Sequence, residues 1–223
     1  MIKIIPSLPA LTYQELTTKL GMVKGLVQTF QIDVSDGLFV PSRSWPMNPG
    51  DDAQFDRLVT GKERLPGADS MEFEVHFMSH SPEKLLPEWE KIGIVRALFH
   101  VESRHDFATL RTTAERYGIE LGVVLKIGTP LSRIESYVPH VSVIQLMGIN
   151  PIGVQGQPFD ERVLPMLREA RALYPDAILQ VDGAVNADTA PLLVQAGATR
   201  LAPGSYIFNA QDVRGAIQQL TSA

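Results

Sequence analysis

The chain has 223 residues, which is enough for one well-buried core, and single α/β barrels have this size. Its net charge is -5 and it has no run of lysine and arginine, so nucleic acid is disfavoured as a partner. It contains no cysteine, which excludes disulfides, zinc fingers and a thiol nucleophile, so any bound metal must take oxygen and nitrogen ligands.

Short apolar segments alternate with amphipathic segments along almost the whole chain. The segments predicted to form strands are 2–5, 26–33, 71–77, 95–101, 121–127, 141–147, 177–183 and 199–204. The segments predicted to form helices are 12–24, 50–60, 82–92, 106–117, 131–138, 159–173, 187–196 and 210–221. This alternation predicts a single (β/α)8 TIM barrel of the α/β class, with residues 1–223 forming one domain. A doubly wound open sheet is the alternative, but the stretch IIPSLPAL lacks the glycine-rich fingerprint of that fold.

Signals for export or membrane insertion are missing from the sequence. The first residues, MIKIIPSLPA, lack the charged and apolar regions of a signal peptide, and no apolar run of about 18 residues occurs. We therefore expect a cytoplasmic protein with no membrane partner. A small anionic molecule is still a suitable ligand, because backbone N–H groups can bind it without a basic surface.

Polar residues stand at the ends of the predicted strands, which form the active-site face of such a barrel. Asp33 lies near the end of the second strand and Asp182 near the end of the seventh. An inward carboxylate needs a metal, a partner or a catalytic task, and two of them across a ligand suit proton removal from one face of a carbon and its return to the other. With His76 they also offer ligands to a divalent metal. The alternative is structural, with Asp33 capping a turn and His76 buried in the core.

Glycines gather after the last three predicted strands. They are Gly153, Gly156, Gly183 and Gly204. In barrels of this type the loops after strands seven and eight present backbone N–H groups to a phosphate. One glycine in a turn can serve backbone freedom alone, so it is the clustering that predicts a phosphate site.

Taken together, these segments resemble the ribulose-phosphate 3-epimerase family. The matching stretches, in family order, are IIPSLPAL, IDVSDGLFVPS, EVHFMSHSPE, FHVES, GVVLKIGTPL, LMGINPIGVQGQPFDERVLPMLRE and LQVDGAVNADTAPLLVQAGATRLAPGSYIF. The resemblance implies a barrel enzyme that interconverts D-ribulose 5-phosphate and D-xylulose 5-phosphate, or a close ketose phosphate. It implies proton transfer at C3 through a metal-stabilised enediolate, and a homo-oligomer as the assembled form.

The resemblance also implies roles for individual residues. Asp33 and Asp182 correspond to the acid and base, which are also metal ligands, and His76 corresponds to a third ligand. The metal would be zinc, iron, manganese or cobalt. The implied substrate-binding residues are Ser7, His76, Met78, Met147, Gly156, Gly183, Ala184, Gly204 and Ser205.

The chain departs from the family pattern at Gln31, where the family has its remaining metal-binding histidine. A glutamine oxygen is a weaker donor to zinc or iron than imidazole, so we expect lower metal affinity and a shift toward Mn²⁺ or Mg²⁺. Loss of the metal is the other outcome, in which Gln31 would hydrogen-bond the substrate or Asp33. Milder departures are Ala184, in place of a second glycine, and the altered loop PIGVQGQPF.

These departures leave two alternative functions open. One is a phosphate-sugar-binding barrel whose activity is weakened, lost or independent of metal. The other is a related barrel lyase or decarboxylase. The lyase would need a lysine-aspartate cluster after the third strand, where this chain has His76, Phe77 and Met78.

Overall fold

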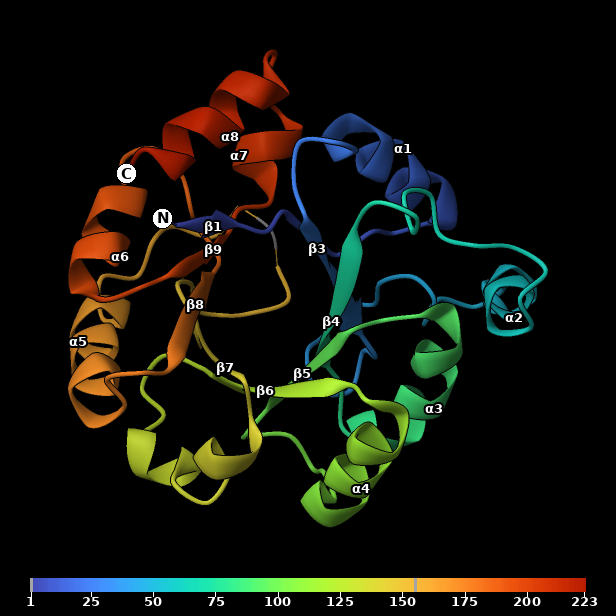
Figure 1. Ribbon diagram of the computed structural model, residues 1–223, viewed down its shortest axis with the longest axis horizontal. Coiled ribbons are helices and arrows are strands. Elements are labelled where there is room, and N and C mark those ends of the chain that lie inside the picture. The colour runs from blue at the N-terminus through green and yellow to red at the C-terminus, as the bar shows by residue number, and fades with distance from the viewer. Residues whose placement is uncertain (1, 155) are drawn as a thin grey trace.

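The computed structural model describes residues 2–154 and 156–223 of the chain. In these residues nine parallel strands form a ring, and the helices lie around its outside (Figure 1). The strands are β1 (Lys3–Ile4), β2 (Ser7–Leu8), β3 (Thr29–Ser35), β4 (Glu72–Met78), β5 (Arg96–His100), β6 (Glu120–Leu125), β7 (Val143–Met147), β8 (Ile178–Asp182) and β9 (Arg200–Ala202). They pair in the order β1-β9-β8-β7-β6-β5-β4-β3-β2. The predicted α/β barrel is confirmed.

The first predicted strand is divided into two short strands. β1 pairs with β9, whereas β2 pairs with β3. Pro6 lies between them and has no N–H to donate, but its carbonyl accepts a hydrogen bond of 2.9 Å from the backbone of Gln31. One stretch of chain therefore connects the last strand to β3 and closes the ring.

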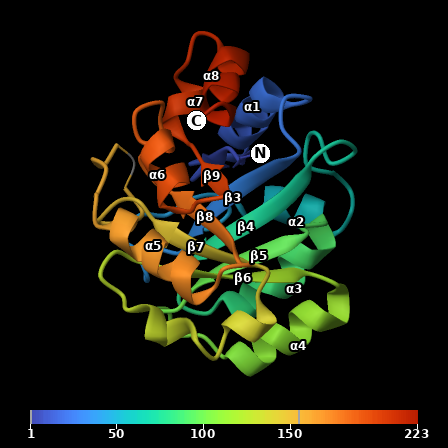
Figure 2. The same ribbon diagram turned by 60° about the vertical axis from the view of Figure 1, so that its left-hand side comes forward.

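The helices are amphipathic and cover the outer face of the strands (Figures 1 and 2). They are α1 (Tyr13–Val23), α2 (Asp52–Val59), α3 (Pro82–Ile92), α4 (Phe107–Tyr117), α5 (Val163–Leu173), α6 (Ala190–Ala196), α7 (Ser205–Phe208) and α8 (Val213–Thr221). The side chains of Thr12, Asp106 and Asp212 accept hydrogen bonds from backbone N–H groups in the first turns of α1, α4 and α8. These caps fix where the three helices begin.

Two predicted helices differ from the observed ones. Segment 131–138 forms a 3₁₀ helix followed by the start of a second one, not an α-helix. Pro139 explains this, because it has no N–H and its ring would clash with the carbonyl of Glu135 in a continuous α-helix. The helix predicted from residue 159 begins at Val163, because the N–H of Asp160 bonds to a carbonyl in the loop after β7.

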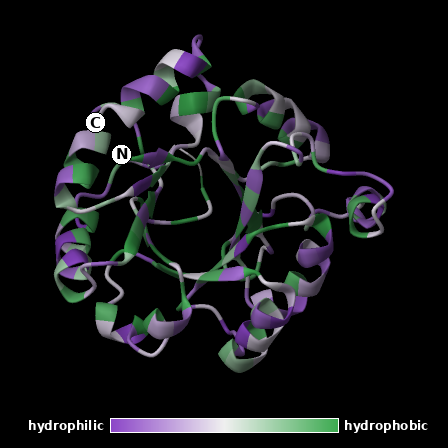
Figure 3. Ribbon diagram, in the orientation of Figure 1, coloured by the Kyte–Doolittle hydropathy of each residue, from purple (hydrophilic) through white to green (hydrophobic). Residues whose placement is uncertain are grey.

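Apolar side chains fill the space between the strands and the helices. Trp45 and Trp89 are both almost fully buried there, with ring centres 5.9 Å apart. Figure 3 shows hydrophobic residues along parts of the strands, and both hydrophilic and hydrophobic residues on the surrounding helices, as expected for amphipathic helices. No helix in the described parts of the chain is long and apolar enough to cross a lipid bilayer.

The inside of the barrel carries a polar layer. We use this name for four fully buried side chains from β3, β4, β7 and β8, which are Gln31, Glu74, Gln145 and Gln180. Strand register pairs Gln31 with Glu74 and Gln145 with Gln180. Because side chains alternate along a strand, residues two positions further on face the same interior, one level closer to the barrel mouth. The polar layer is therefore the floor beneath the strand ends.

Candidate active site

A pocket opens at the carboxyl ends of the strands. The predicted site residues that line it are Ser7, Asp33, Met78, Met147, Gly153, Gly156, Asp182, Gly183, Ala184, Gly204 and Ser205. The sequence analysis did not select Pro9, Ile149, Val154, Gln157 and Val185, which also line it. None of the lining residues in the described segments is lysine or arginine, so an anionic ligand would rely on backbone N–H groups.

Asp33, His76 and Asp182 meet below this pocket. Asp33 and His76 are register partners on β3 and β4, which places them side by side, and Asp182 comes from β8. His76 Nδ1 lies 3.1 Å from Asp33 Oδ1 and 3.4 Å from Asp182 Oδ2. Ser7 Oγ donates a hydrogen bond of 3.2 Å to Asp182 Oδ1. The barrel thus brings together side chains from strands that are far apart in the sequence.

The three residues form a donor set that fits a divalent metal. Each of Asp33, His76 and Asp182 offers one ligand atom, and these atoms lie within 4.8 Å of one another. Two carboxylate oxygens and one imidazole nitrogen are suitable for zinc, iron, manganese or cobalt. The group is buried, so an ion bound there would be largely shielded from solvent.

Gln31 is oriented differently from a ligand. Its Nε2 atom donates hydrogen bonds to Asp33 Oδ1 at 2.8 Å and to Asp182 Oδ2 at 3.0 Å. An amide nitrogen is a donor with no free lone pair for a metal. In this orientation Gln31 joins the two carboxylates to each other.

The surroundings shift the acid–base properties of the site. Burial, together with the nearby charge of Asp182, raises the pKa of Asp33 to about 6. Burial disfavours the charged form of His76, but its hydrogen bonds to Asp182 and Asp33 outweigh this and raise the pKa of His76 to about 9. Asp33 can therefore exchange a proton near neutral pH.

A chain of hydrogen bonds fixes the proton positions on His76 from behind. The Lys126 backbone N–H and the Thr129 hydroxyl both donate to Glu102 Oε1, at 2.9 and 2.6 Å, so this carboxylate accepts. His100 Nδ1 lies 3.2 Å from Glu102 Oε2 and carries the proton of that contact. His100 Nε2 is then a bare acceptor 2.9 Å from His76 Nε2, which must be protonated. His76 Nδ1 faces the aspartates, and a metal held there would replace the proton that this nitrogen donates to them.

His100 ends β5 and Glu102 follows two residues later, and the sequence analysis did not connect either of them to His76. The available signal was the His-x-Glu spacing at the end of β5, where His100 is the last strand residue and Glu102 lies in the following loop. The connection becomes visible only in the structure, where β4 and β5 pair in parallel and the centres of the His76 and His100 rings lie 5.0 Å apart.

The buried position of His100 predicts a pH-dependent stability difference. Burial lowers the pKa of His100 from 6.5 to about 4, so between these values the unfolded chain takes up a proton and the folded protein does not. Folding stability is therefore lost as the pH falls through this window, by at most about 3 kcal/mol from this group. The His100→Gln variant lacks this titrating group. Its loss of unfolding free energy relative to wild type should therefore be smaller near pH 4.5 than near pH 7.

Urea unfolding of both proteins at the two pH values, with a chelator present, measures this difference. An equal destabilisation by His100→Gln at both pH values would contradict the assignment. Asp33 also titrates in this window, and it is present in both proteins.

Backbone geometry shapes the far side of the pocket. Gly183 has φ +100° and is followed by Ala184 at φ +55°, so two successive residues are in left-handed conformations. Gly204 lies against Ser7, and a Cβ at position 204 would stand 3.1 Å from the Ser7 carbonyl oxygen. These close approaches expose the backbone of the loops after β8 and β9 to the pocket.

Comparisons with known proteins agree with this architecture. The model of the ribulose-phosphate 3 epimerase family matches residues 3–208. The ribulose-phosphate 3-epimerase of Bacillus subtilis is 32% identical over 227 residues, which cover 99% of this chain and 98% of that protein. The ribulose-phosphate 3-epimerase of Aquifex aeolicus is 28% identical over 204 residues, which cover 90% and 86%.

Solved structures with low sequence identity share the fold. The 3-keto-L-gulonate-6-phosphate decarboxylase of Vibrio cholerae aligns with a TM-score of 0.70 at 12% identity, covering 100% of this chain and 95% of that one. The 3-hexulose-6-phosphate synthase of Salmonella typhimurium aligns with a TM-score of 0.68 at 16% identity, covering 99% and 97%. The chain itself belongs to the ribulose-phosphate 3-epimerase family, whose members are isomerases acting on carbohydrate phosphates.

Proposed function

We propose that this enzyme interconverts D-ribulose 5-phosphate and D-xylulose 5-phosphate, or a close ketose phosphate, by moving the proton at C3. The observation that carries the proposal is the placement of Asp33 and Asp182. These two buried carboxylates come from β3 and β8, line one pocket and are joined through the amide of Gln31. Epimerisation requires an acid and a base that reach one carbon from two sides, which this arrangement supplies.

The two aspartates would work in opposite protonation states. The ionised one takes the C3 proton and leaves an enediolate, and the protonated one returns a proton to the opposite face. Their roles exchange when the reaction runs in reverse. Ser7, which donates to Asp182 Oδ1, would keep that carboxylate aimed at the substrate.

Asp33, His76 and Asp182 would hold the divalent metal, which we propose is zinc, iron, manganese or cobalt. When bound, the metal supplies positive charge that stabilises negative charge developing on substrate oxygens, a contribution of several kcal/mol. His76 would be kept in the required tautomer by His100 and Glu102. Met78 and Met147 give the pocket an apolar wall beside these charges.

The substrate phosphate would bind at the loops after β8 and β9. Gly183, Ala184, Gly204 and Ser205 line this end of the pocket. Backbone N–H groups at such loops are the usual phosphate donors of barrel enzymes. They also explain how an acidic protein with no basic residue among the described lining residues could bind an anion.

Deuterium exchange tests the proposed reaction. Purified enzyme in D₂O is expected to incorporate deuterium at C3 of D-ribulose 5-phosphate, detected by NMR, and to produce the C3 epimer. Binding without exchange would instead support the alternative of a phosphate-sugar-binding barrel that has lost turnover. Absence of exchange with every ketose phosphate tried would exclude the epimerase.

The left-handed conformation of Ala184 gives a stability prediction. A residue with a Cβ is strained at φ +55°, by roughly 1–2 kcal/mol, whereas glycine is not. Glycine also adds freedom to the unfolded chain, so Ala184→Gly should raise the free energy of unfolding by up to about 1 kcal/mol. Ala184→Val should lower it, because a β-branched residue is least tolerated there. Urea unfolding measures both, and destabilisation by Ala184→Gly would contradict the strain.

We also propose that residues 1–223 act as one domain and assemble as a homo-oligomer. The one-domain proposal is supported by the closed ring, in which β1 and β9 pair. The assembly is supported by large apolar side chains at the surface, such as Leu11 and Leu38, which are 64% and 68% exposed. Light scattering on the purified protein tests the assembly.

A further inference from the structure

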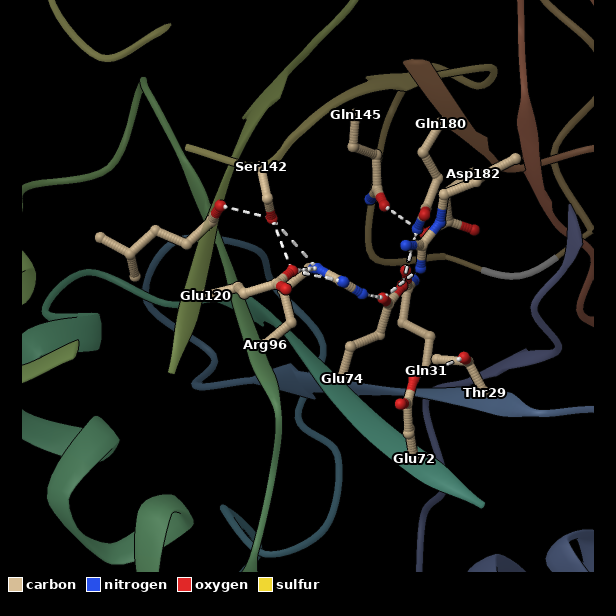
Figure 4. Close-up of polar contacts among 12 residues, drawn as sticks. Thr29, Gln31, Glu72, Glu74, Arg96, Glu120, Ser142, Gln145, Gln180 and Asp182 are labelled. Atoms are coloured by element: carbon tan, nitrogen blue, oxygen red, sulfur yellow. Dashed lines mark hydrogen bonds and ion pairs between the residues drawn. The ribbon is translucent and has the colours of Figure 1, made fainter. Parts of the chain in front are cut away.

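We infer that Gln31 is a positioning residue, not a metal ligand: its amide donates to both aspartates, and the polar layer beneath fixes that orientation. The positioning role rests on the proposed epimerase reaction. The orientation rests on contacts among buried residues alone. Figure 4 shows these contacts, with Gln145 and Gln180 approaching Gln31 and Glu74 inside the barrel.

The orientation begins with Glu74 on β4. Its Oε2 atom lies 2.7 Å from Arg96 Nη1 and also bonds to Arg200 Nη2. Arginine is always protonated in proteins, so these two partners can only donate and Glu74 accepts. Glu74 is fully buried, and its two carboxylate oxygens therefore form a fixed acceptor below the site.

Glu74 in turn orients Gln180. The Nε2 atom of Gln180 lies 2.9 Å from Glu74 Oε1, 2.7 Å from Gln145 Oε1 and 2.8 Å from Gln31 Oε1. All three neighbours are oxygen atoms, so this position fits the amide nitrogen, whose two hydrogens can be donated to two of them at a time, and not the amide oxygen. Turning the Gln180 amide by 180° would place its oxygen against these three oxygens, one of which belongs to the Glu74 carboxylate. The observed orientation leaves Gln180 Oε1 without a partner in the described residues, which is the smaller cost.

Gln180 then decides which way Gln31 points. Because Gln180 Nε2 donates to Gln31 Oε1, the Gln31 nitrogen must face the opposite way, toward Asp33 and Asp182. The reverse orientation would place Oε1 against two carboxylates and Nε2 against another amide nitrogen. A metal could relieve the first contact but not the second. Ligation through Gln31 therefore requires the polar layer to rearrange.

This arrangement has a function in proton transfer. Gln31 binds Asp33 Oδ1 and Asp182 Oδ2, and Ser7 binds Asp182 Oδ1. Each aspartate is thereby held by a neutral donor that gives up no proton at working pH, and Asp33 Oδ2 is left to face the ligand. A fixed spacing of acid and base matters, because a displacement of about 1 Å can lower the rate a hundredfold.

The test uses Gln31→Met, which keeps the side-chain length and removes both the donor and the oxygen. Mn²⁺ titration of chelator-treated protein by calorimetry should give a dissociation constant about tenfold or more above that of wild type, because the two carboxylate ligands lose the donor that holds them. In the C3 exchange assay, kcat should fall about tenfold or more while KM stays within about threefold, because Gln31 contacts the aspartates and not the substrate.

Gln145→Met is the matched control, since it removes an amide from the same polar layer without touching Gln31 or the aspartates. It should leave both Mn²⁺ affinity and kcat close to wild type. Unchanged Mn²⁺ binding by Gln31→Met would overturn the inference, because it would show that the Gln31 amide does not hold the two aspartates. An unchanged kcat in Gln31→Met would overturn the positioning role.

Gln180→Met is the second variant, and it tests the orientation when Gln31→Met does not fold. Without Gln180 the Gln31 amide is free to turn its oxygen toward a metal, so Mn²⁺ affinity should rise about threefold or more. Unchanged or weaker Mn²⁺ binding by Gln180→Met would contradict the claim that Gln180 fixes the orientation of the Gln31 amide. The Mn²⁺ titrations need no turnover, so they test the role of Gln31 even if the wild-type enzyme exchanges no substrate proton. Absence of exchange in wild type would refute only the proposed function.

Discussion

Asp182→Asn is expected to lower kcat for C3 epimerisation by about a thousandfold, because the amide can neither take nor return a proton. The side chain keeps its size, so the hydrogen bond from Ser7 can be retained and KM should change little. Steady-state kinetics with D-ribulose 5-phosphate measures the effect. Asp69→Asn is the control, since this carboxylate is 87% exposed, and it should keep full activity.

Exchange measurements make the prediction for the aspartate pair sharper. A variant that keeps one of the two aspartates can still remove the C3 proton from one epimer, the one whose proton points toward the remaining carboxylate. Asp33→Asn and Asp182→Asn, assayed with saturating Mn²⁺ because each also loses a carboxylate ligand, should therefore each exchange deuterium into one epimer only, and into opposite ones. Exchange into both epimers by either variant would show that a single group carries out both proton transfers.

Glu74→Gln is expected to lower the free energy of unfolding by about 3–5 kcal/mol. Glu74 is fully buried between Arg96 and Arg200, so removing its charge leaves two buried guanidinium groups without their shared partner. Arg96 would keep Glu120, but Arg200 has no other carboxylate within salt-bridge distance in the described residues. Urea unfolding at neutral pH measures the loss.

Glu120→Gln provides the comparison, because Glu120 also pairs with Arg96 but its side chain is 52% exposed. Exposed pairs contribute about 1 kcal/mol or less, so this variant should be nearly as stable as wild type. Similar losses from the two substitutions would mean that burial does not set the strength of these pairs. The network would then be a weaker support for Gln180 than the distances indicate.

Much of the fold could be predicted because the signals are local. Strands such as β3 and β4 alternate apolar and polar residues, and several helices begin at capping residues such as Asp106. The helix expected at 131–138 failed because the effect of Pro139 on the preceding turn outweighed the apolar periodicity. The division of the first strand depends on pairing with two different neighbours, which no local pattern reveals.

The site was predictable to the level of residue type but not of atom. Strand ends of a barrel meet, so Asp33, His76 and Asp182 could be expected together from their positions alone. Which atom of Gln31 faces them depends on Gln180, which contacts it from the other side of the barrel. The sequence does carry a trace of this layer, since each member lies two residues before a site or pocket residue. The pairs are Gln31 and Asp33, Glu74 and His76, Gln145 and Met147, and Gln180 and Asp182.

The two-part first strand also sets when the pocket can exist during protein synthesis. Ser7 bonds through its backbone N–H to the carbonyl of Pro203 and through its hydroxyl to Asp182. Nearly the whole chain must therefore leave the ribosome before the start of the barrel meets its last strand. A nascent chain that ends before β9 already carries Asp33, His76 and Asp182 but has no closed ring to hold them. Ligand binding thus becomes possible only when the barrel is complete.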